Sequence, residues 1–397
     1  MPKTLILGID IRSLAGGAYT GVGEYTRNLL KYMTPLDKGI QFKLFFNAQS
    51  YAPDIGFLDG RENIRAYFFR YPNKYFSATT RFFNTPKIDK MIGGCDVFFS
   101  PHFIAAPVSQ SCKKVITFHD LSFERYPEFF DLQRKFWHFS NRPKRQALAA
   151  DKIIAVSEST AYDLRDIYGA DSHKIFVVYS GVDNSFSKEI AQDDLRRVKA
   201  KYNLPDNFVF SLSTIEPRKN VYGTIKAFEL LKNYYKSEYT KVRRSSYFCI
   251  DAVSLVIAGK PGWLYRDVFN TIKKSKYRND IRYIGFIDDA DKPALYKLSS
   301  AFVYPSIYEG FGFPVLEAMA AGTPVITSAC SSLPEVAEDA ALLVDPFKIS
   351  DIAWVMKEVL CSEKLASSLI KKGLLQAEKF SWQKCAEETL KVLLTSV

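Results

Sequence analysis

Residues 304–322 read Tyr-Pro-Ser-Ile-Tyr-Glu-Gly-Phe-Gly-Phe-Pro-Val-Leu-Glu-Ala-Met-Ala-Ala-Gly, and this is the most informative stretch of the chain. An apolar run ends at Tyr304, and a loop with two glycines follows it. Pro314 suits the first turn of a helix, and Gly322 suits its end. The stretch therefore predicts a strand, a glycine-rich turn and a helix in direct succession.

Two carboxylates lie in this unit, Glu309 in the loop and Glu317 in what we expect to be the first helical turn. Free backbone N–H groups at a helix N-terminus attract anions, and glycine lets the backbone approach a ligand closely. The site can therefore offer amides to a phosphate and carboxylates to sugar or ribose hydroxyls. Alternatively, Glu317 alone complements the helix dipole, but this does not account for the whole constellation.

The pattern of a strand followed by a helix repeats on both sides of this unit. The strands that we expect lie at residues 4–9, 42–46, 96–99, 114–118, 152–156 and 174–178, and then at residues 208–212, 253–258, 281–284, 301–304, 324–327 and 341–344. Residues 23–33 and 157–168 read as helices, with Ser157 as an N-cap. A polar stretch after Ser180-Gly-Val-Asp183 separates the two series. We therefore predict an α/β protein with two doubly wound domains facing across a cleft that holds the ligand.

Composition limits the classes of partner. The chain of 397 residues is 47% hydrophobic and carries a net charge of +11, with a pI of about 9.1. This charge suits nucleotide phosphates, nucleic acid or an anionic membrane surface. Its six cysteines form no C-x-x-C pair, so we expect reduced thiols and no metal site. The sequence contains no run of 18 apolar residues, so we expect no membrane-spanning helix.

The stretch that begins at Tyr304 resembles the motif of family 4 glycosyltransferases, which have the GT-B fold. The resemblance rests on the two glutamates, the Gly-Phe-Gly-Phe-Pro loop and the Ala-Met-Ala-Ala-Gly-Thr-Pro-Val end. The resemblance implies that Glu309 contacts the donor sugar and that Glu317 holds the nucleotide ribose. It also implies that backbone amides of the loop reach the sugar and the diphosphate, at Phe311, Gly312 and Phe313.

Further segments match this family in order. Ser213-Thr-Ile-Glu-Pro-Arg-Lys-Asn220 follows a strand, and the family places two cations here to neutralise the donor diphosphate, which implies Arg218 and Lys219. We expect this loop to be exposed, so that substitutions there leave folding intact. Thr117-Phe-His-Asp120 also follows a strand and resembles the family's His-Asp pair. It implies that His119 bonds to the donor sugar or supports its cationic transition state.

Loops at other strand ends resemble the nucleotide-binding parts of the family. Ala258-Gly-Lys-Pro-Gly-Trp263 implies Lys260, and Gly285-Phe-Ile-Asp288 implies Phe286 and Ile287 beside the base. Near the N-terminus, the resemblance implies three donor-binding glycines in a loop before a helix. They are Gly17, Gly21 and Gly23. Read alone, they match G-x-G-x-x-G weakly, since Thr26 replaces the third glycine and no acidic residue ends the next strand.

The family likeness also implies a domain plan and a reaction. We expect a first domain at residues 1–185, a donor domain at 186–379 and a helix at 380–397 that crosses back. Ser180 departs from the family, which usually has Asn there. The implied enzyme is a retaining hexosyltransferase that needs no cofactor or metal, because Arg218 and Lys219 replace a divalent ion. No dedicated base is implied, and Asp120 is the nearest candidate.

A finer resemblance is to bacterial mannosyl- and rhamnosyltransferases of surface-polysaccharide assembly, on His119-Asp-Leu-Ser-Phe-Glu-Arg-Tyr-Pro-Glu-Phe-Phe130. It favours GDP-mannose as donor, with UDP-glucose as runner-up, and a glycan or lipid-linked glycan as acceptor. The alternative from another class is a basic, nonenzymatic protein that binds nucleic acid or membrane. No known nucleic-acid-binding motif appears, so we expect no nucleic-acid partner.

Two stretches interrupt the βα pattern. Residues 61–90 carry seven basic and two acidic residues together with eight aromatic ones, a net charge of +5. Either this segment contacts an anionic membrane, placing a cytoplasmic protein peripherally on the inner face, or its aromatic side chains fill the core and residues 64–69 form a strand. Residues 232–244 are basic and Tyr-rich and read as a surface insertion between a helix and a strand.

Overall fold

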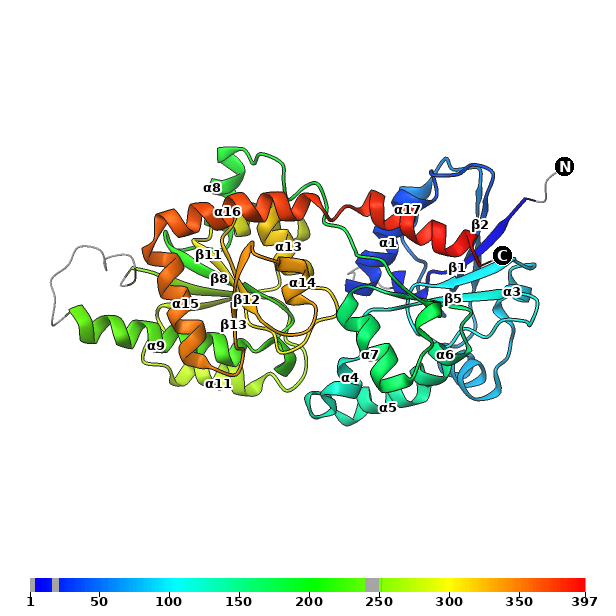
Figure 1. The fold of residues 1–397 in the computed structure, drawn as a ribbon, viewed down its shortest axis with the longest axis horizontal. Helices are drawn as coiled ribbons and strands as arrows, with labels where there is room; N and C mark the ends of the chain where they lie inside the picture. Colours follow the sequence, from blue (N-terminus) through cyan, green and yellow to red (C-terminus); the bar gives the residue numbers. More distant parts are fainter. Residues whose placement is uncertain (1–3, 16–20, 240–249, 251, 397) are drawn as a thin grey trace. The chain divides into compact units, whose positions relative to one another are not determined.

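The computed structural model describes residues 4–15, 21–239, 250 and 252–396, and the chain divides into two compact units (Figure 1). The first unit contains Met1–Pro127, Leu132–Gly181 and Ser381–Val397, and the second contains Glu128–Asp131 and Val182–Phe380. The change of unit after Gly181 lies close to the expected boundary at residue 185, and the C-terminal helix belongs to the first unit.

A parallel sheet of seven strands forms the centre of the first unit, in the order β3-β2-β1-β4-β5-β6-β7. Its strands are β1 (Ile6–Asp10), β2 (Gln41–Asn47), β3 (Ile64–Phe69), β4 (Val97–Ser100), β5 (Lys113–Phe118), β6 (Lys152–Ala155) and β7 (Ile175–Val177). Six of them lie where the apolar runs predict a strand. The seventh, β3, stands at the sheet edge, where Arg65 and Phe68 are exposed, so it lacks the continuous apolar run of a buried strand.

The second unit has a parallel sheet of six strands, in the order β10-β9-β8-β11-β12-β13. They are β8 (Phe208–Leu212), β9 (Ser254–Ala258), β10 (Ile281–Gly285), β11 (Ala301–Tyr304), β12 (Val325–Ser328) and β13 (Ala341–Val344). Each corresponds to one expected strand. The prediction of two doubly wound α/β units is therefore confirmed.

Helices cover both sheets. Those of the first unit are α1 (Gly21–Met33), α2 (Asn73–Ala78), α3 (Ile88–Met91), α4 (Ser122–Arg125), α5 (Leu132–Asn141), α6 (Pro143–Ala149), α7 (Glu158–Tyr168) and α17 (Trp382–Leu394). The predicted N-cap of α7 is confirmed, because Ser157 Oγ accepts a hydrogen bond of 3.0 Å from the backbone N–H of Thr160. Helix α17 packs on α1, with the Trp382 ring 6.0 Å from that of Tyr25.

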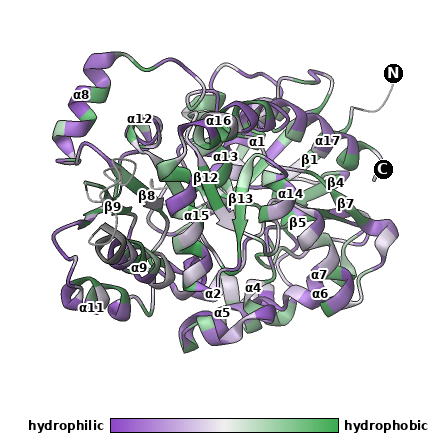
Figure 2. Ribbon diagram, turned by 60° about the vertical axis from the view of Figure 1, so that its left-hand side comes forward, coloured by the Kyte–Doolittle hydropathy of each residue, from purple (hydrophilic) through white to green (hydrophobic). Residues whose placement is uncertain are grey.

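The helices of the second unit are α8 (Gln192–Lys201), α9 (Val221–Tyr239), α11 (Arg266–Lys274), α12 (Lys292–Leu298), α13 (Phe313–Ala320), α14 (Leu333–Ala337), α15 (Ile349–Cys361) and α16 (Glu363–Glu378). Successive residues of β8 face opposite sides of the sheet. Val209 joins the core formed with α9, α11 and α15, whereas the Phe210 ring packs 5.5 Å from Tyr296 of α12. Figure 2 shows the strands as hydrophobic and the outlying α8 as largely hydrophilic.

The interpretation of residues 232–244 as an insertion between a helix and a strand is wrong for residues 232–239, which belong to α9. Helix α9 continues to Tyr239, and Lys232 is buried with its ammonium 3.3 Å from the carboxylate of Asp280. The aliphatic stem of a lysine can lie along apolar surface, which allows a basic residue in this position. Residues 240–244 lie outside the described part of the chain.

Each unit has one point where the strand order reverses, between β1 and β4 in the first sheet and between β8 and β11 in the second. In open parallel sheets, ligands bind at the carboxyl ends of the strands beside such a reversal. The loops after β8 and β11 are therefore where the topology places a site in the second unit. No helix in the described residues is both long enough and apolar enough to cross a membrane.

Candidate functional site

The loops that follow β8 and β11 are joined directly to each other at the strand reversal. The backbone N–H of Ile307 donates to the carbonyl of Arg218 over 2.8 Å, and the hydroxyl of Ser306 donates to the same carbonyl over 3.0 Å. Asn220, in the left-handed conformation with φ of 52°, donates from its amide to the carbonyl of Pro305 over 3.1 Å. These bonds hold the two loops in one arrangement although they are far apart in the sequence.

A buried ion cluster forms where these loops meet. Lys219 Nζ lies 2.6 Å from Glu309 Oε1, and Arg218 Nη1 lies 3.1 Å from Glu309 Oε2. Arg218 also contacts Glu216, with 3.0 Å between Nη2 and Oε1. The carboxylate of Glu309 further accepts hydrogen bonds from the hydroxyls of Tyr304 (2.7 Å) and Ser306 (2.6 Å). The structure thus brings together three residues that the sequence places in the site.

These charges stabilise one another. Burial alone would raise the pKa of the Glu309 carboxyl, but the charges of Lys219 and Arg218 outweigh burial and hold that pKa at about 2. Glu309 is therefore ionised at neutral pH. Burial and the charge of Arg218 lower the pKa of Lys219, and the ion pair with Glu309 opposes that change.

The expectation of an exposed cationic loop is wrong. The side chains of Arg218 and Lys219 are only 14% and 12% exposed, because both lean onto Glu309. Removing either cation leaves a buried carboxylate with fewer partners, and an unpaired buried charge is costly. Substitutions at these positions should therefore affect folding as well as any ligand.

The glycine turn after Glu309 is built as the sequence predicts. Gly312 has φ of +112°, a backbone conformation that residues with a side chain rarely adopt, so glycine is favoured at this position. Helix α13 begins at the next residue, Phe313, and Pro314 lies in its first turn. Phe311 is buried, and its carbonyl accepts a hydrogen bond from Ser332 Oγ over 2.9 Å.

We expected Glu317 in the first turn of α13, and this expectation is wrong. Glu317 is the fifth residue of that helix, which begins one residue before Pro314, and it points away from solvent. The hydroxyl of Tyr296 donates to its Oε2 over 2.8 Å. Burial raises the pKa of Glu317, and the charge of Lys292 opposes that rise. A buried carboxylate in the second turn does not serve mainly to complement the helix dipole.

Lys260, Phe286 and Ile287 follow the ends of the neighbouring strands β9 and β10. The ammonium of Lys260 lies 4.2 Å from the centre of the half-exposed Phe286 ring, a cation–π contact, whereas Ile287 is buried. Gly259 lets the end of β9 approach the loop after β8 closely, because a Cβ there would lie 1.8 Å from the carbonyl oxygen of Ser213. The side chain of Phe286, and not that of Ile287, therefore offers a surface for a planar ring.

In the first unit, His119 follows β5. Its Nε2 lies 2.7 Å from the carbonyl of Pro101, and its ring packs edge-on against Tyr25 at 4.8 Å. Burial lowers the pKa of His119, although the Pro101 contact and the charge of Asp120 oppose this, so the ring is neutral at pH 7. Since only a protonated Nε2 can donate to a carbonyl, Nδ1 carries the lone pair and can accept a hydrogen bond.

The glycines near the N-terminus fit the expectation less well. Gly17 lies outside the described residues. Gly21 and Gly23 do not precede a helix, because α1 already begins at Gly21, and Gly23 is buried within its first turn. They are part of the helix and not of a loop before it.

Sequence reasoning missed two further groups at strand ends of this unit. Arg12, just after β1, donates to Asp10 with 2.9 Å between Nε and Oδ1, and it also donates to the carbonyl of Ala105 over 3.0 Å. His102, just after β4, has its ring 5.9 Å from that of His119. Their position after neighbouring parallel strands was the available signal. Among the described residues, no three His, Cys, Asp or Glu side chains are grouped to hold a metal ion.

Two protein-family models match the two halves of the chain. Residues 19–186 match the protein-family model described as "Glycosyltransferase Family 4", and residues 192–376 match the one described as "Glycosyl transferases group 1". The chain is 27% identical over 392 residues to "O-antigen chain mannosyltransferase B" of Escherichia coli, covering 94% of this chain and 95% of that protein.

A second relative and one solved structure extend the comparison. "Serotype-specific mannosyltransferase WbdA" of Escherichia coli is 34% identical over 238 residues, which are 60% of this chain and only 28% of that protein. Sucrose-phosphate synthase from Thermosynechococcus elongatus superposes with a TM-score of 0.75 at 18% identity, covering 98% of each chain. The solved structure establishes the likeness of fold.

The ion cluster predicts how stability depends on pH. The pKa of Glu309 is below that of an unfolded glutamate, so its pairing stabilises the fold fully above about pH 4.5 and loses this effect as the pH falls toward 2. The shift corresponds to about 3 kcal/mol. We expect Glu309→Gln to lower the melting temperature at pH 7, and the difference from wild type to shrink between pH 5 and pH 3, measured by scanning fluorimetry.

The matched control is Glu378→Gln, the same substitution at an exposed position of α16 in the same unit. It should leave the melting temperature nearly unchanged at every pH. A Glu309→Gln protein whose deficit stays constant from pH 7 to pH 3 would show that the ion pairs do not stabilise the fold.

Proposed function

We propose that this chain, which belongs to the family 4 glycosyltransferases and has their GT-B fold, moves a hexose from a nucleoside-diphosphate sugar to a glycan or lipid-linked glycan, with retention of configuration. The observation that carries the proposal is the pair of cations held by Glu309 at the strand reversal of the second sheet. We favour mannose from GDP-mannose, since the Escherichia coli relatives are named mannosyltransferases. UDP-glucose is the runner-up.

The cluster suits a diphosphate leaving group. Negative charge develops on that group as the glycosidic bond breaks, and fixed cations stabilise such charge without rearranging. The Lys219 ammonium has three donors, and the described residues provide two acceptors, Glu309 and Tyr304. One donor therefore remains for a ligand. Because Arg218 and Lys219 supply the positive charge, we propose that the reaction needs neither metal nor cofactor.

The acceptor hydroxyl must lose a proton as its oxygen bonds to the sugar. We propose that an oxygen of the departing diphosphate takes that proton, so that no protein base is required. Asp120 suits the role of base poorly, because its Oδ1 accepts from both the backbone N–H (3.0 Å) and the hydroxyl (2.7 Å) of Ser122. Neutral His119 contributes Nδ1 as an acceptor for a sugar hydroxyl.

The direct test of the function is a donor panel. Purified protein incubated with GDP-mannose should release GDP faster than it releases UDP from UDP-glucose, and EDTA should leave the rate unchanged. Loss of activity in EDTA with rescue by Mn²⁺ or Mg²⁺ would overturn metal independence, and faster release from UDP-glucose would reverse the donor preference. Failure to release any nucleoside diphosphate, with either donor and a range of glycan acceptors, would refute the assignment.

Removing one cation should slow the reaction strongly. We expect Arg218→Ala and Lys219→Ala each to lower turnover by about 100-fold, the scale of losing one electrostatic stabiliser. Since both side chains are mostly buried, the charge-preserving variants Arg218→Lys and Lys219→Arg separate chemistry from folding. Lys226→Ala is the control, because that lysine pairs with Glu229 on the surface of α9 in the same unit. Normal turnover in both alanine variants would exclude a role at the diphosphate.

The sequence leaves two alternatives for residues 61–90, contact with an anionic membrane or packing of their aromatic side chains in the core. The segment has features of both. Tyr67, Phe69 and Phe76 pack in or against a core cluster of the first unit, as the core alternative requires. Other aromatic side chains of the segment are exposed by half or more, and these are Phe68, Tyr71, Tyr75, Phe82 and Phe83. We therefore propose a cytoplasmic protein that touches an anionic membrane through this exposed subset and the cations near it.

Vesicle binding tests this contact. We expect the protein to sediment with vesicles that contain anionic lipid, since each exposed cation near such a surface contributes about 1 kcal/mol. Binding should fall with salt and weaken at least tenfold in the triple variant Arg65→Gln, Arg70→Gln, Lys74→Gln. The control is Lys364→Gln, Lys371→Gln, Lys384→Gln, three exposed lysines of α16 and α17. A wild type that stays in the supernatant at low salt would disprove membrane contact.

A further inference from the structure

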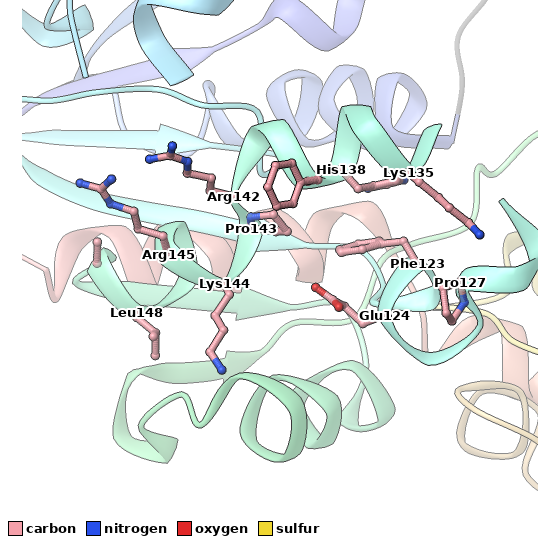
Figure 3. Close-up of a pocket in the computed structure, with 12 residues that line it drawn as sticks. Phe123, Glu124, Pro127, Lys135, His138, Arg142, Pro143, Lys144, Arg145 and Leu148 are labelled. Carbon is pink, nitrogen blue, oxygen red and sulfur yellow. The ribbon is translucent and has the colours of Figure 1, made fainter. Parts of the chain in front are cut away.

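The first unit contains a cavity of about 880 Å³ that the reaction described above does not use (Figure 3). It is lined by side chains from α4, α5 and α6 and from the turn at Pro127. Its volume lies within the range of sites for small molecules, roughly 300–1,000 Å³. The cavity is therefore large enough to hold a ligand.

Apolar side chains form much of its wall. They come from three elements and include Phe123, Phe139, Pro143 and Leu148. The Phe123 ring stacks on that of His138 at 4.1 Å, which fixes one side of the wall. Burial lowers the pKa of His138 to about 4, so this ring is neutral at pH 7. Phe139 and Leu148 nevertheless remain 77% and 46% exposed, so apolar surface stays in contact with water.

Four cations belong to the same lining, Lys135, Arg142, Lys144 and Arg145, and all four are exposed. Figure 3 shows them spread around the apolar residues, with Arg142 and Arg145 on one side and Lys135 on the other. The one carboxylate in the lining is Glu124, whose Oε1 accepts a hydrogen bond of 2.8 Å from the hydroxyl of Tyr168. The rim of the cavity is therefore positively charged.

The neutral part of the lining disfavours a sugar or a nucleotide base as the ligand. No serine, threonine, asparagine or glutamine side chain from the described residues faces this cavity. A sugar needs many hydrogen-bonding partners in its site, and so does the edge of a nucleotide base. An apolar wall with a cationic rim is instead complementary to a molecule with an apolar chain and an anionic end.

We propose that this cavity binds a lipid that ends in a phosphate or diphosphate, with the chain against Phe123, Phe139 and Leu148 and the phosphate at the rim. The surface beside it supports a lipid as the occupant. Leu132 and Phe136, on the same helix as Phe139, are 85% and 65% exposed. In addition, the Arg142 guanidinium lies 5.6 Å from the centre of the exposed Phe82 ring. Apolar and cationic groups thus continue from the cavity onto the surrounding surface.

The identity of this lipid as the anchor of the acceptor rests on the proposed function, whereas the binding itself does not. Farnesyl phosphate is a suitable probe, because it carries a short isoprenoid chain and one phosphate. We expect it to bind the full chain in calorimetry, below its micelle concentration, at least tenfold more tightly than farnesol, inorganic phosphate or UMP. Equal binding of farnesol or of inorganic phosphate would overturn the proposal, and so would tighter binding of UMP.

Two sets of variants locate the site. Arg145→Gln and Leu148→Glu should each weaken the binding of farnesyl phosphate at least tenfold. Lys384→Gln and Leu394→Glu on α17 of the same unit are their controls, and Leu394 is 42% exposed against 46% for Leu148. Arg145 is exposed and no salt bridge ties it to the described residues, so Arg145→Gln keeps the test valid if Leu148→Glu fails to fold. Unchanged affinity in Arg145→Gln would show that the cationic rim does not bind the phosphate, and it would overturn the proposed site.

The two proposals can fail separately. Binding of farnesyl phosphate without release of nucleoside diphosphate from any donor would refute the transferase assignment and leave the lipid site in place. Transfer of sugar by a protein that does not bind farnesyl phosphate would refute the lipid site alone. In an active protein that binds the probe, Arg145→Gln should raise KM for a lipid-phosphate acceptor and leave the release of GDP by water unchanged.

Discussion

The candidate site depends on one buried ion cluster, in which Glu309 is bonded by Lys219, Arg218 and two hydroxyls. Taking these charges out of water costs several kcal/mol for each ion, and only dense pairing and hydrogen bonding offset that cost. The pairing also ties the loop after β8 to the loop after β11, two strands that are neighbours in the sheet but not in the sequence. The positive charges are therefore held in place before any ligand arrives, as electrostatic stabilisation of a leaving group requires.

Most of the fold could be predicted because buried parallel strands have a distinctive sequence. The runs in β8 and β11 are apolar along their whole length, since helices cover both faces of the sheet. The same argument explains why residues 64–69 admit two interpretations, one of them the strand that the structure confirms, and why the end of α9 was missed. Strand β3 lies at an edge and alternates exposed with partly buried residues, and the last turns of α9 are basic and rich in tyrosine. Neither carries the signal of complete burial, and each depends on neighbours that the sequence does not reveal.

The candidate site could be predicted in its residues but not in its electrostatics. The glycine at position 312 and the helix start beside it follow from local backbone rules, so the turn is readable from the sequence. The pairing of Lys219 with Glu309 joins residues 90 positions apart, and no local rule predicts it. For that reason, the two cations of a loop that reads as exposed and basic prove to be mostly buried. The carboxylate of Glu317 lies in the second helical turn and not in the first for a simpler cause, because α13 begins at Phe313, one residue before Pro314.

The two units present positive charge in physically different ways, and this difference bears on what each can bind. In the ion cluster of the second unit, Arg218 and Lys219 are mostly buried and paired with carboxylates, so their field is local and little screened by salt. They suit a ligand that is positioned precisely and whose charge grows during a reaction. Around the cavity of the first unit the cations are exposed and outnumber the single carboxylate, so their field extends into solvent and weakens with salt. Such a rim suits a ligand that arrives from a charged surface and is retained by its apolar part, because the affinity then comes from burial of the chain more than from any one ion pair.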